Sequence, residues 1–155
     1  MSVSMIGKKA PAFKAKDQNG KTISLADFKG NNVVLYFYPQ DGTPTCTVQA
    51  CNLRDHFGVL RNKNYVVVGV SPDDVGKHKK FEDKHDLPFT LIADTDLKVI
   101  KKYGVWGEKM MYGKKYMGLI RTTFLIDKNG VIRHVIEKPK AKEHAKEILA
   151  MGADL

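Results

Sequence analysis

Strand-like runs alternate with helix-like runs along this chain, and this alternation limits the available folds more than any other feature. The runs predicted as strands are short and apolar, and they are Val33–Tyr38, Tyr65–Val70, Phe89–Ala93, Thr122–Ile126 and Val131–Ile136. The segments predicted as helices lie between and after them, and they are Thr45–Arg61, Val75–His85, Thr95–Tyr103 and Ala141–Met151. This order predicts an α/β domain in which helices cover a sheet.

Two turn signals add hairpins to this pattern. The tetrapeptide Asp-Lys-Asn-Gly at 127–130 separates the last two predicted strands, which predicts that they form a β-hairpin. The Asn-Gly pair at 19–20 separates Phe13–Ala15 from Thr22–Leu25, which predicts a smaller hairpin near the N-terminus. We therefore expect a thioredoxin-like fold, with a central mixed β-sheet flanked by helices and an N-terminal β-hairpin extension.

The chain has 155 residues, 43% of them hydrophobic, and we expect a single domain over residues 1–155. No apolar run approaches the roughly 18–20 residues that cross a bilayer. The first ten residues also lack the apolar stretch of a secretory signal. We therefore expect no membrane association and a cytoplasmic location. In that reducing compartment, catalytic or transient disulfides are more common than structural ones.

The formal net charge of +9 comes mainly from lysines spread along the whole chain. Only four of the 26 basic residues are arginines. A nucleic-acid groove tends to use clustered arginine with interleaved aromatic residues, whereas scattered lysine is typical of a solvated surface. We expect no nucleic-acid binding, although a basic nucleic-acid-binding protein remains an alternative that salt-dependent retention on DNA would test.

The segment Val105–Leu119 shows neither strand nor helix periodicity. It mixes three glycines with aromatic residues and three methionines. We expect a surface loop with a few side chains anchored in the core. The alternative is an adaptable apolar wall beside an active site, because thioethers and aromatic rings suit such a surface.

Both cysteines, Cys46 and Cys51, lie just after the first predicted strand of the central sheet. Cys46 falls at the turn from that strand into a predicted helix. The first turn of a helix offers unpaired amide donors and a positive dipole end, which favour the reactive thiolate form of a cysteine. The placement of both cysteines there predicts thiol chemistry.

Attack of Cys46 on a peroxide needs a thiolate, an O–O bond in line with the sulfur, and stabilisation of the leaving oxygen. Thr43 can bring a hydroxyl from the same turn, and Pro39 can cap the pocket and limit water. Arg121 can supply a guanidinium, because it opens an apolar strand where an unpaired charge is rare. The alternative for Arg121 is a strand-end side chain that simply reaches solvent.

These residues resemble the active-site signature of the peroxiredoxins. The pattern Pro39-x-x-x-Thr43-x-x-Cys46 stands in a hydrophobic-Tyr-Pro context, and a second cysteine follows five residues later. That second cysteine is similar to the bacterioferritin comigratory protein branch, also called peroxiredoxin Q. The resemblance covers nearly the whole chain, and it includes the segments Val34–Pro39, Gly69–Pro72, Leu91–Asp94, Tyr103–Lys109 and Arg121–Asp127.

The resemblance implies a thiol-dependent peroxidase that acts on hydrogen peroxide and organic hydroperoxides in antioxidant defence. It implies that Cys46 is the peroxidatic cysteine and forms a sulfenic acid, which Cys51 resolves as an intramolecular disulfide. A thioredoxin or a similar dithiol protein would then reduce the disulfide. The resemblance implies no cofactor and no metal, and we expect a monomer.

The resemblance also assigns roles around the sulfur. Thr43 and Arg121 would position the peroxide, and Pro39 would shield the sulfenate. The backbone amides of Thr45 and Cys46 would complete the pocket. Gln49 occupies a position where the wider family uses a glutamate or glutamine to orient the arginine. Thr45 stands where this branch usually has glycine, a departure expected to stiffen the turn or change its opening rate and to leave activity in place.

The five-residue spacing of the cysteines predicts a conformational change. On one regular helix their Cα atoms would be about 8.6 Å apart. A disulfide requires no more than roughly 7 Å. Disulfide formation therefore requires at least one turn of the helix to unwind. The alternative for Cys51 is a small buried side chain without a redox role.

Two other classes of protein, and a catalytic role for one histidine, agree less well with the sequence. A thioredoxin-type oxidoreductase shares the expected fold, but it usually has two residues between its cysteines, and here there are four. A cysteine–histidine metal module is disfavoured because the five histidines show no finger-like spacing to the cysteines. His56 would lie about 15 Å along the helix axis from Cys46, so we expect a solvated histidine there and no general base.

Overall fold

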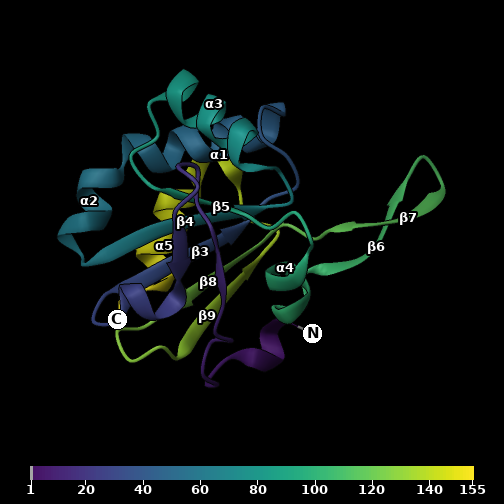
Figure 1. Cartoon of the computed structure of the whole chain (residues 1–155). Coiled ribbons are helices and arrows are strands. Elements are labelled where there is room, and N and C mark those ends of the chain that lie inside the picture. Colours follow the sequence, from purple (N-terminus) through teal and green to yellow (C-terminus); the bar gives the residue numbers. More distant parts are fainter. Residues whose placement is uncertain (1) are drawn as a thin grey trace.

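The computed structural model describes residues 2–155 and contains a seven-stranded mixed sheet (Figure 1). The strands run in the order β2-β1-β5-β4-β3-β8-β9. β3, β4 and β5 pair in parallel, whereas β8 pairs antiparallel with β3 and with β9. The bounds are β1 (Lys14–Lys16), β2 (Thr22–Ser24), β3 (Asn32–Phe37), β4 (Tyr65–Ser71), β5 (Thr90–Ala93), β8 (Thr122–Ile126) and β9 (Ile132–Glu137).

Helices cover both faces of this sheet (Figure 1). One face packs against α1 (Pro44–Asp55), α2 (Phe57–Asn62), α3 (Val75–His85) and α5 (His144–Met151). The other face packs against α4 (Lys98–Lys102) and the 3₁₀ segments η1 (Ser2–Met5) and η2 (Leu25–Phe28). A third 3₁₀ segment, η3 (Ala141–Glu143), leads into α5. Among the described residues, no helix combines the length and the apolar character needed to cross a membrane.

Strand β3 lies between two partners and is buried along its whole length. Successive side chains of a strand point to opposite faces, so β3 contributes to both cores. Val33, Leu35 and Phe37 lie in the core under α4, whereas Val34 and Tyr36 lie in the core under α1 and α3. The chain leaves β3 after Phe37, and the loop that follows leads to the start of α1 at Pro44.

The predicted strands and hairpins of the sheet are confirmed, with small shifts at their ends. The N-terminal hairpin pairs β1 with β2, and the Asp17 carboxylate accepts the amide hydrogens of Asn19 and Lys21 in its turn. The C-terminal hairpin pairs β8 with β9, and the Asp127 carboxylate closes its turn through the amides of Asn129 and Val131. In both turns an aspartate side chain accepts backbone amide hydrogens, as in an Asx turn.

The predicted helix Thr45–Arg61 is divided into α1 and α2 at His56. The imidazole of His56 and its own amide both lie within hydrogen-bonding distance of the Asn52 carbonyl, at 2.9 and 3.2 Å. A side chain that bonds to the backbone in this way competes with regular helix formation. His56 is exposed at the helix end, as expected.

Two further predicted helices are shorter than expected. The helix predicted over Thr95–Tyr103 begins only at Lys98, because Leu97 has a left-handed backbone with φ 63°. The buried Asp94 carboxylate accepts the amide hydrogens of Val99 and Ile100 and so holds this late start. The segment predicted as a helix over Ala141–Met151 begins with η3 before α5 continues it.

The expected surface loop at Val105–Leu119 was wrong, because the segment forms a hairpin of β6 (Trp106–Met111) and β7 (Lys114–Leu119). The two residues of its turn, Tyr112 and Gly113, have φ of 51° and 76°, the backbone that a tight two-residue hairpin requires. The hairpin projects from the body of the molecule (Figure 1). Its base is anchored by the buried ends of the segment, whereas its outer methionines and tyrosines are exposed.

Gly69 leaves room for the buried ring of Tyr36 on the neighbouring strand. A Cβ atom at position 69 would lie 2.9 Å from ring atoms of Tyr36. We expect Gly69→Ala to lower the free energy of unfolding by about 1–3 kcal/mol, because overpacking forces a buried ring to shift. Gly58→Ala is the matched control, since its Cβ would meet no atom within 4 Å. Urea unfolding of both variants tests this, and a Gly69→Ala protein as stable as the parent would contradict it.

Candidate active site

Cys46 is buried in the first turn of α1, with 1% of its surface exposed. Thr43 is the N-cap of this helix, and Pro44 follows at the first helical position, where its fixed φ suits the helix and no amide hydrogen is needed. The first bond along the helix joins the Thr47 amide to the Thr43 carbonyl. The amides of Thr45 and Cys46 therefore lie at the helix end where N–H groups have no partner within the helix.

Arg121 reaches this helix from the start of β8, the strand next to β3. Strand β3 ends beside the start of β8, where Phe37 pairs with Thr122. Arg121 directly precedes β8, so this register brings it to the sheet edge from which α1 begins. One guanidinium nitrogen, Nη2, lies 3.1 Å from the Cys46 sulfur, and the other, Nη1, donates to Gln49 Oε1 at 2.8 Å.

Gln49 lies three residues after Cys46 on α1 and is completely buried. Residues three apart share one helix face, so Cys46 and Gln49 both face Arg121. The guanidinium thus bridges the sulfur and the amide oxygen, and the half-buried Arg121 points inward. Arg121 therefore contacts the Cys46 sulfur, and the alternative, a strand-end side chain that simply reaches solvent, does not describe this geometry.

The other predicted site residues surround the start of α1. The Thr43 hydroxyl donates to the Gln40 carbonyl at 3.0 Å, so its oxygen keeps its capacity to accept a hydrogen bond. Pro39 is half-buried between the end of β3 and this loop. Both residues therefore lie in the connection that leads from the sheet to Cys46.

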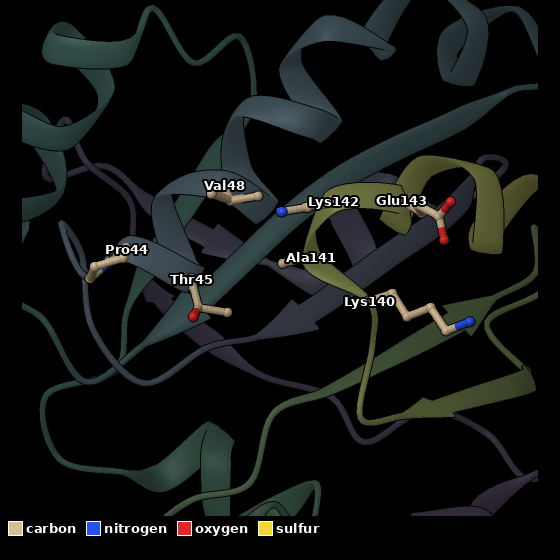
Figure 2. A pocket seen from close by; sticks show the side chains of 7 residues that line it. All are labelled: Pro44, Thr45, Val48, Lys140, Ala141, Lys142 and Glu143. Atoms are coloured by element: carbon tan, nitrogen blue, oxygen red, sulfur yellow. The ribbon is translucent and has the colours of Figure 1, made fainter.

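Thr45 lies on a different face of α1 from Cys46. Its exposed side chain and that of Val48 line a concavity of about 550 Å³ between α1 and the η3 region (Figure 2). The Cys46 side chain is buried and contacts Arg121. The threonine side chain, which stands where the resembling branch has glycine, therefore occupies space outside the buried sulfur site.

A buried polar network that the sequence did not reveal holds the loop before α1. Asp41 accepts the Tyr38 hydroxyl at 2.5 Å and contacts His78 Nδ1 at 2.6 Å. His78 Nε2 donates to the Ile92 carbonyl at 2.9 Å, and the Asp41 amide donates to Asp73 at 2.7 Å. This network ties the loop to β5 and to the β4–α3 connection, and it thereby fixes the approach of the chain to Cys46.

Asp41, Asp73 and His78 also have the donor atoms of a possible metal site, all within 4.8 Å of one another. Each of these atoms already takes part in a hydrogen bond or ion pair, including one from Lys77 to Asp73 at 3.0 Å. Neither cysteine belongs to the cluster. The hydrogen bonds that hold the loop before α1 account for the closeness of these three side chains.

Tyr36 is a second feature that the sequence did not reveal. It shares the buried core cluster of Cys46, and its hydroxyl and Gln49 Nε2 are buried without a hydrogen-bond partner among the described residues. Burial raises the pKa of Tyr36 well above its usual value, and the negative charges of Asp41 and Cys46 add to this effect. Tyr36 is therefore a neutral hydroxyl that can donate a hydrogen bond.

Cys51 lies on the same unbroken helix as Cys46, and both thiols are free. Its side chain is half-buried and faces α3, where its sulfur lies 3.8 Å from His85 Nδ1. Because α1 is one regular helix, the expected separation of about 8.6 Å between the Cα atoms of the two cysteines applies to it. In this conformation, the two sulfurs cannot bond without a change in the helix.

A free cysteine near a helix N-terminus, in contact with an arginine, is an arrangement that favours a reactive thiol, and comparisons with known proteins show the family to which the chain belongs. The model of the AhpC/TSA family matches residues 6–135. Peroxiredoxin Bcp of Bacillus subtilis is 45% identical over 150 residues, which cover 97% of this chain and 96% of the relative. Peroxiredoxin Bcp of Escherichia coli K12 is 45% identical over 143 residues, 92% of each chain.

Solved structures give the same result. The bacterioferritin comigratory protein of Xanthomonas campestris has a TM-score of 0.86 at 31% identity, over 92% of this chain and 91% of that one. A cysteine-to-serine mutant of PrxQ from Xylella fastidiosa has a TM-score of 0.89 at 29% identity, over 96% and 95% of the two chains. The chain belongs to the AhpC/TSA family and, within it, to the Bcp or PrxQ peroxiredoxins. The predicted thioredoxin-like fold is confirmed.

Proposed function

We propose that this protein reduces hydrogen peroxide and organic hydroperoxides through Cys46, with Cys51 as the resolving cysteine. Membership of the peroxiredoxins supports a thiol-dependent peroxidase. The observation that carries the assignment of Cys46 is its 3.1 Å contact with Arg121 at the start of α1. A guanidinium and a helix N-terminus both favour a negatively charged sulfur, and that thiolate is the nucleophile.

In the first step, the Cys46 thiolate attacks one peroxide oxygen. The S–O bond forms as the O–O bond breaks, the sulfur loses two electrons, and the leaving oxygen takes a proton to become water or an alcohol. Arg121 stabilises the charge that develops on the two oxygens. The Thr43 oxygen accepts the peroxide hydrogen bond, the amides of Thr45 and Cys46 donate to the bound oxygens, and Pro39 limits water.

Gln49 acts by orienting Arg121. Its amide oxygen holds Nη1 at 2.8 Å, which leaves Nη2 directed at the sulfur. A fixed guanidinium loses less conformational entropy when it binds peroxide than a mobile one does. The Tyr36 hydroxyl is a further buried donor in the same cluster, available to an oxygen bound on Cys46.

In the second step, the Cys51 sulfur attacks the Cys46 sulfenic acid, a disulfide forms, and water leaves. Because both cysteines lie on one regular helix, the start of α1 unwinds to let the sulfurs meet. A thioredoxin or similar dithiol protein then reduces the disulfide by thiol exchange. We propose that the protein carries out this cycle as a monomer in the cytoplasm.

Stopped-flow mixing of the reduced protein with hydrogen peroxide or tert-butyl hydroperoxide tests the proposal. The half-buried Trp106 provides a fluorescence signal, and peroxide consumption is measured in parallel. We expect rapid consumption of about one equivalent without a reductant and little reduction of insulin disulfides. Strong insulin reduction with slow peroxide consumption would instead identify a thioredoxin-type oxidoreductase.

A further inference from the structure

Cys51 has an environment of its own, separate from the site around Cys46. Its sulfur faces α3 and lies 3.8 Å from Nδ1 of His85, within reach of an S–H···N hydrogen bond. The His85 ring lies edge-on to the ring of Phe81, with centroids 5.2 Å apart, which restricts its orientation. An imidazole is the side chain best able to take a proton near neutral pH.

Arg54 brings a positive charge to the same place. It lies three residues after Cys51 and therefore on the same helix face. Its Nη1 donates to the His85 carbonyl at 2.8 Å, so it is held against α3 at the same residue that contacts the sulfur. The pKa of Arg54 is raised, first by its hydrogen bond to Asp55 and also by negative charge on Cys51.

We propose that His85 is a further catalytic residue, a general base that removes the proton of the Cys51 thiol during disulfide formation, and that Arg54 stabilises the resulting thiolate. This inference rests on the proposed role of Cys51 as the resolving cysteine. The Cys51 thiolate attacks the Cys46 sulfenic sulfur, the S–S bond forms and the S–O bond breaks. The departing hydroxide takes the proton from His85 and leaves as water, which restores neutral imidazole.

The part of α1 that carries Cys51 is anchored, so this contact can persist while Cys46 moves. Asn52 donates to the Lys142 carbonyl at 2.9 Å and accepts the Ala145 amide at 2.8 Å. With the Arg54 bond to α3, these contacts fix the part of α1 that directly follows Cys51 against η3, α5 and α3. The structure therefore favours unwinding of the first turns, which brings the Cys46 sulfenic acid to a Cys51 that is already activated.

The remaining charged groups near His85 lie at the surface or are paired. The Asp55 carboxylate accepts from Arg54 at 3.0 Å, and Glu82 is paired with Lys79 at 2.8 Å. The titratable and charged groups that contact His85 from α1 are Cys51 and Arg54, and its charged neighbours along the chain on or just after α3 are Glu82, Lys84 and Asp86. None of them offers the Cys51 thiol a contact like that of His85 Nδ1 among the described hydrogen bonds.

The test uses the full-length Cys46→Ser variant, in which Cys51 is the one remaining thiol. We expect His85→Asn in this background to slow alkylation of Cys51 by iodoacetamide about tenfold at pH 7, because no base takes the proton. At pH 10 the difference should vanish, since an ordinary thiol is then ionised. His134→Asn, which removes a histidine paired with Asp154, is the matched control and should change neither rate.

The same His85 substitution is then made with Cys46 intact. We expect the reaction with peroxide to keep its rate, and the conversion of sulfenic acid, trapped with dimedone, to disulfide to slow about tenfold at pH 7. His85→Gln repeats the test with a different shape and no base. Equal alkylation rates with and without His85 at pH 7, or an equal loss at pH 7 and pH 10, would overturn the inference. If the parent protein forms no Cys46–Cys51 disulfide, the proposed function itself fails.

Discussion

Replacement of Arg121 by alanine is expected to slow the reaction of Cys46 with peroxide about 10²- to 10³-fold, the usual effect of removing one donor to a developing oxyanion. The side chain contacts both the sulfur and Gln49, so its loss removes a charge that favours the thiolate and donors for the peroxide oxygens. Stopped-flow fluorescence of the reduced variant measures the second-order rate constant directly.

Two substitutions make the Arg121 result specific. Arg121→Lys keeps the positive charge but loses the fork of donors, so we expect it to recover only part of the rate. Arg133→Ala is the matched control, since Arg133 is exposed and pairs with Asp127 and Asp154, neither of which belongs to the site around Cys46. Rates close to those of the parent for Arg121→Ala would remove this residue from the mechanism. Circular dichroism verifies that each variant is folded.

Replacement of Cys51 by serine is expected to end catalytic turnover while leaving the first oxidation intact. The Cys51→Ser protein should consume one equivalent of peroxide and stop at the Cys46 sulfenic acid, because no internal thiol can displace the hydroxyl group. Mass spectrometry after dimedone trapping checks the product. An added small thiol should restore turnover. In the matched Cys46→Ser protein, we expect no peroxide consumption.

The Cys51→Ser result separates the two interpretations of Cys51. If this residue is only a small half-buried side chain, the variant should turn over with a thioredoxin at the rate of the parent protein. Sustained turnover of Cys51→Ser with thioredoxin alone would therefore exclude an essential resolving role.

The start of α1 could be predicted from the sequence because its signals are local. Thr43 and Cys46 lie within one turn, next to a buried strand that the apolar run identifies. Arg121 is distant in sequence, but it opens an apolar strand, and the pairing of β3 with β8 carries it to the site. Its contact with the sulfur, by contrast, depends on tertiary packing that no local pattern encodes.

The features that the sequence did not reveal depend on long-range contacts or exposed surfaces. His78 meets Asp41 across 37 residues, and His85 meets Cys51 across 34, so neither pair leaves a spacing that could be recognised. The β6–β7 hairpin was predicted as a loop because its apolar residues do not alternate with polar ones on a buried face. Tyr112 in its turn has a positive φ, which is uncommon for a bulky residue and therefore is not expected from the sequence.

Hydrogen exchange of the reduced and oxidised protein tests most directly the central claim, that the helix carrying both cysteines opens so that they can bond. Amides of residues 47–54 should be protected in the reduced protein and should lose protection once mass spectrometry shows the Cys46–Cys51 disulfide, most strongly before Asn52. The Cys51→Ser protein, oxidised to its sulfenic acid, should keep the protection of the reduced form. Equal protection of these amides in the reduced and the disulfide-bonded protein would contradict the account.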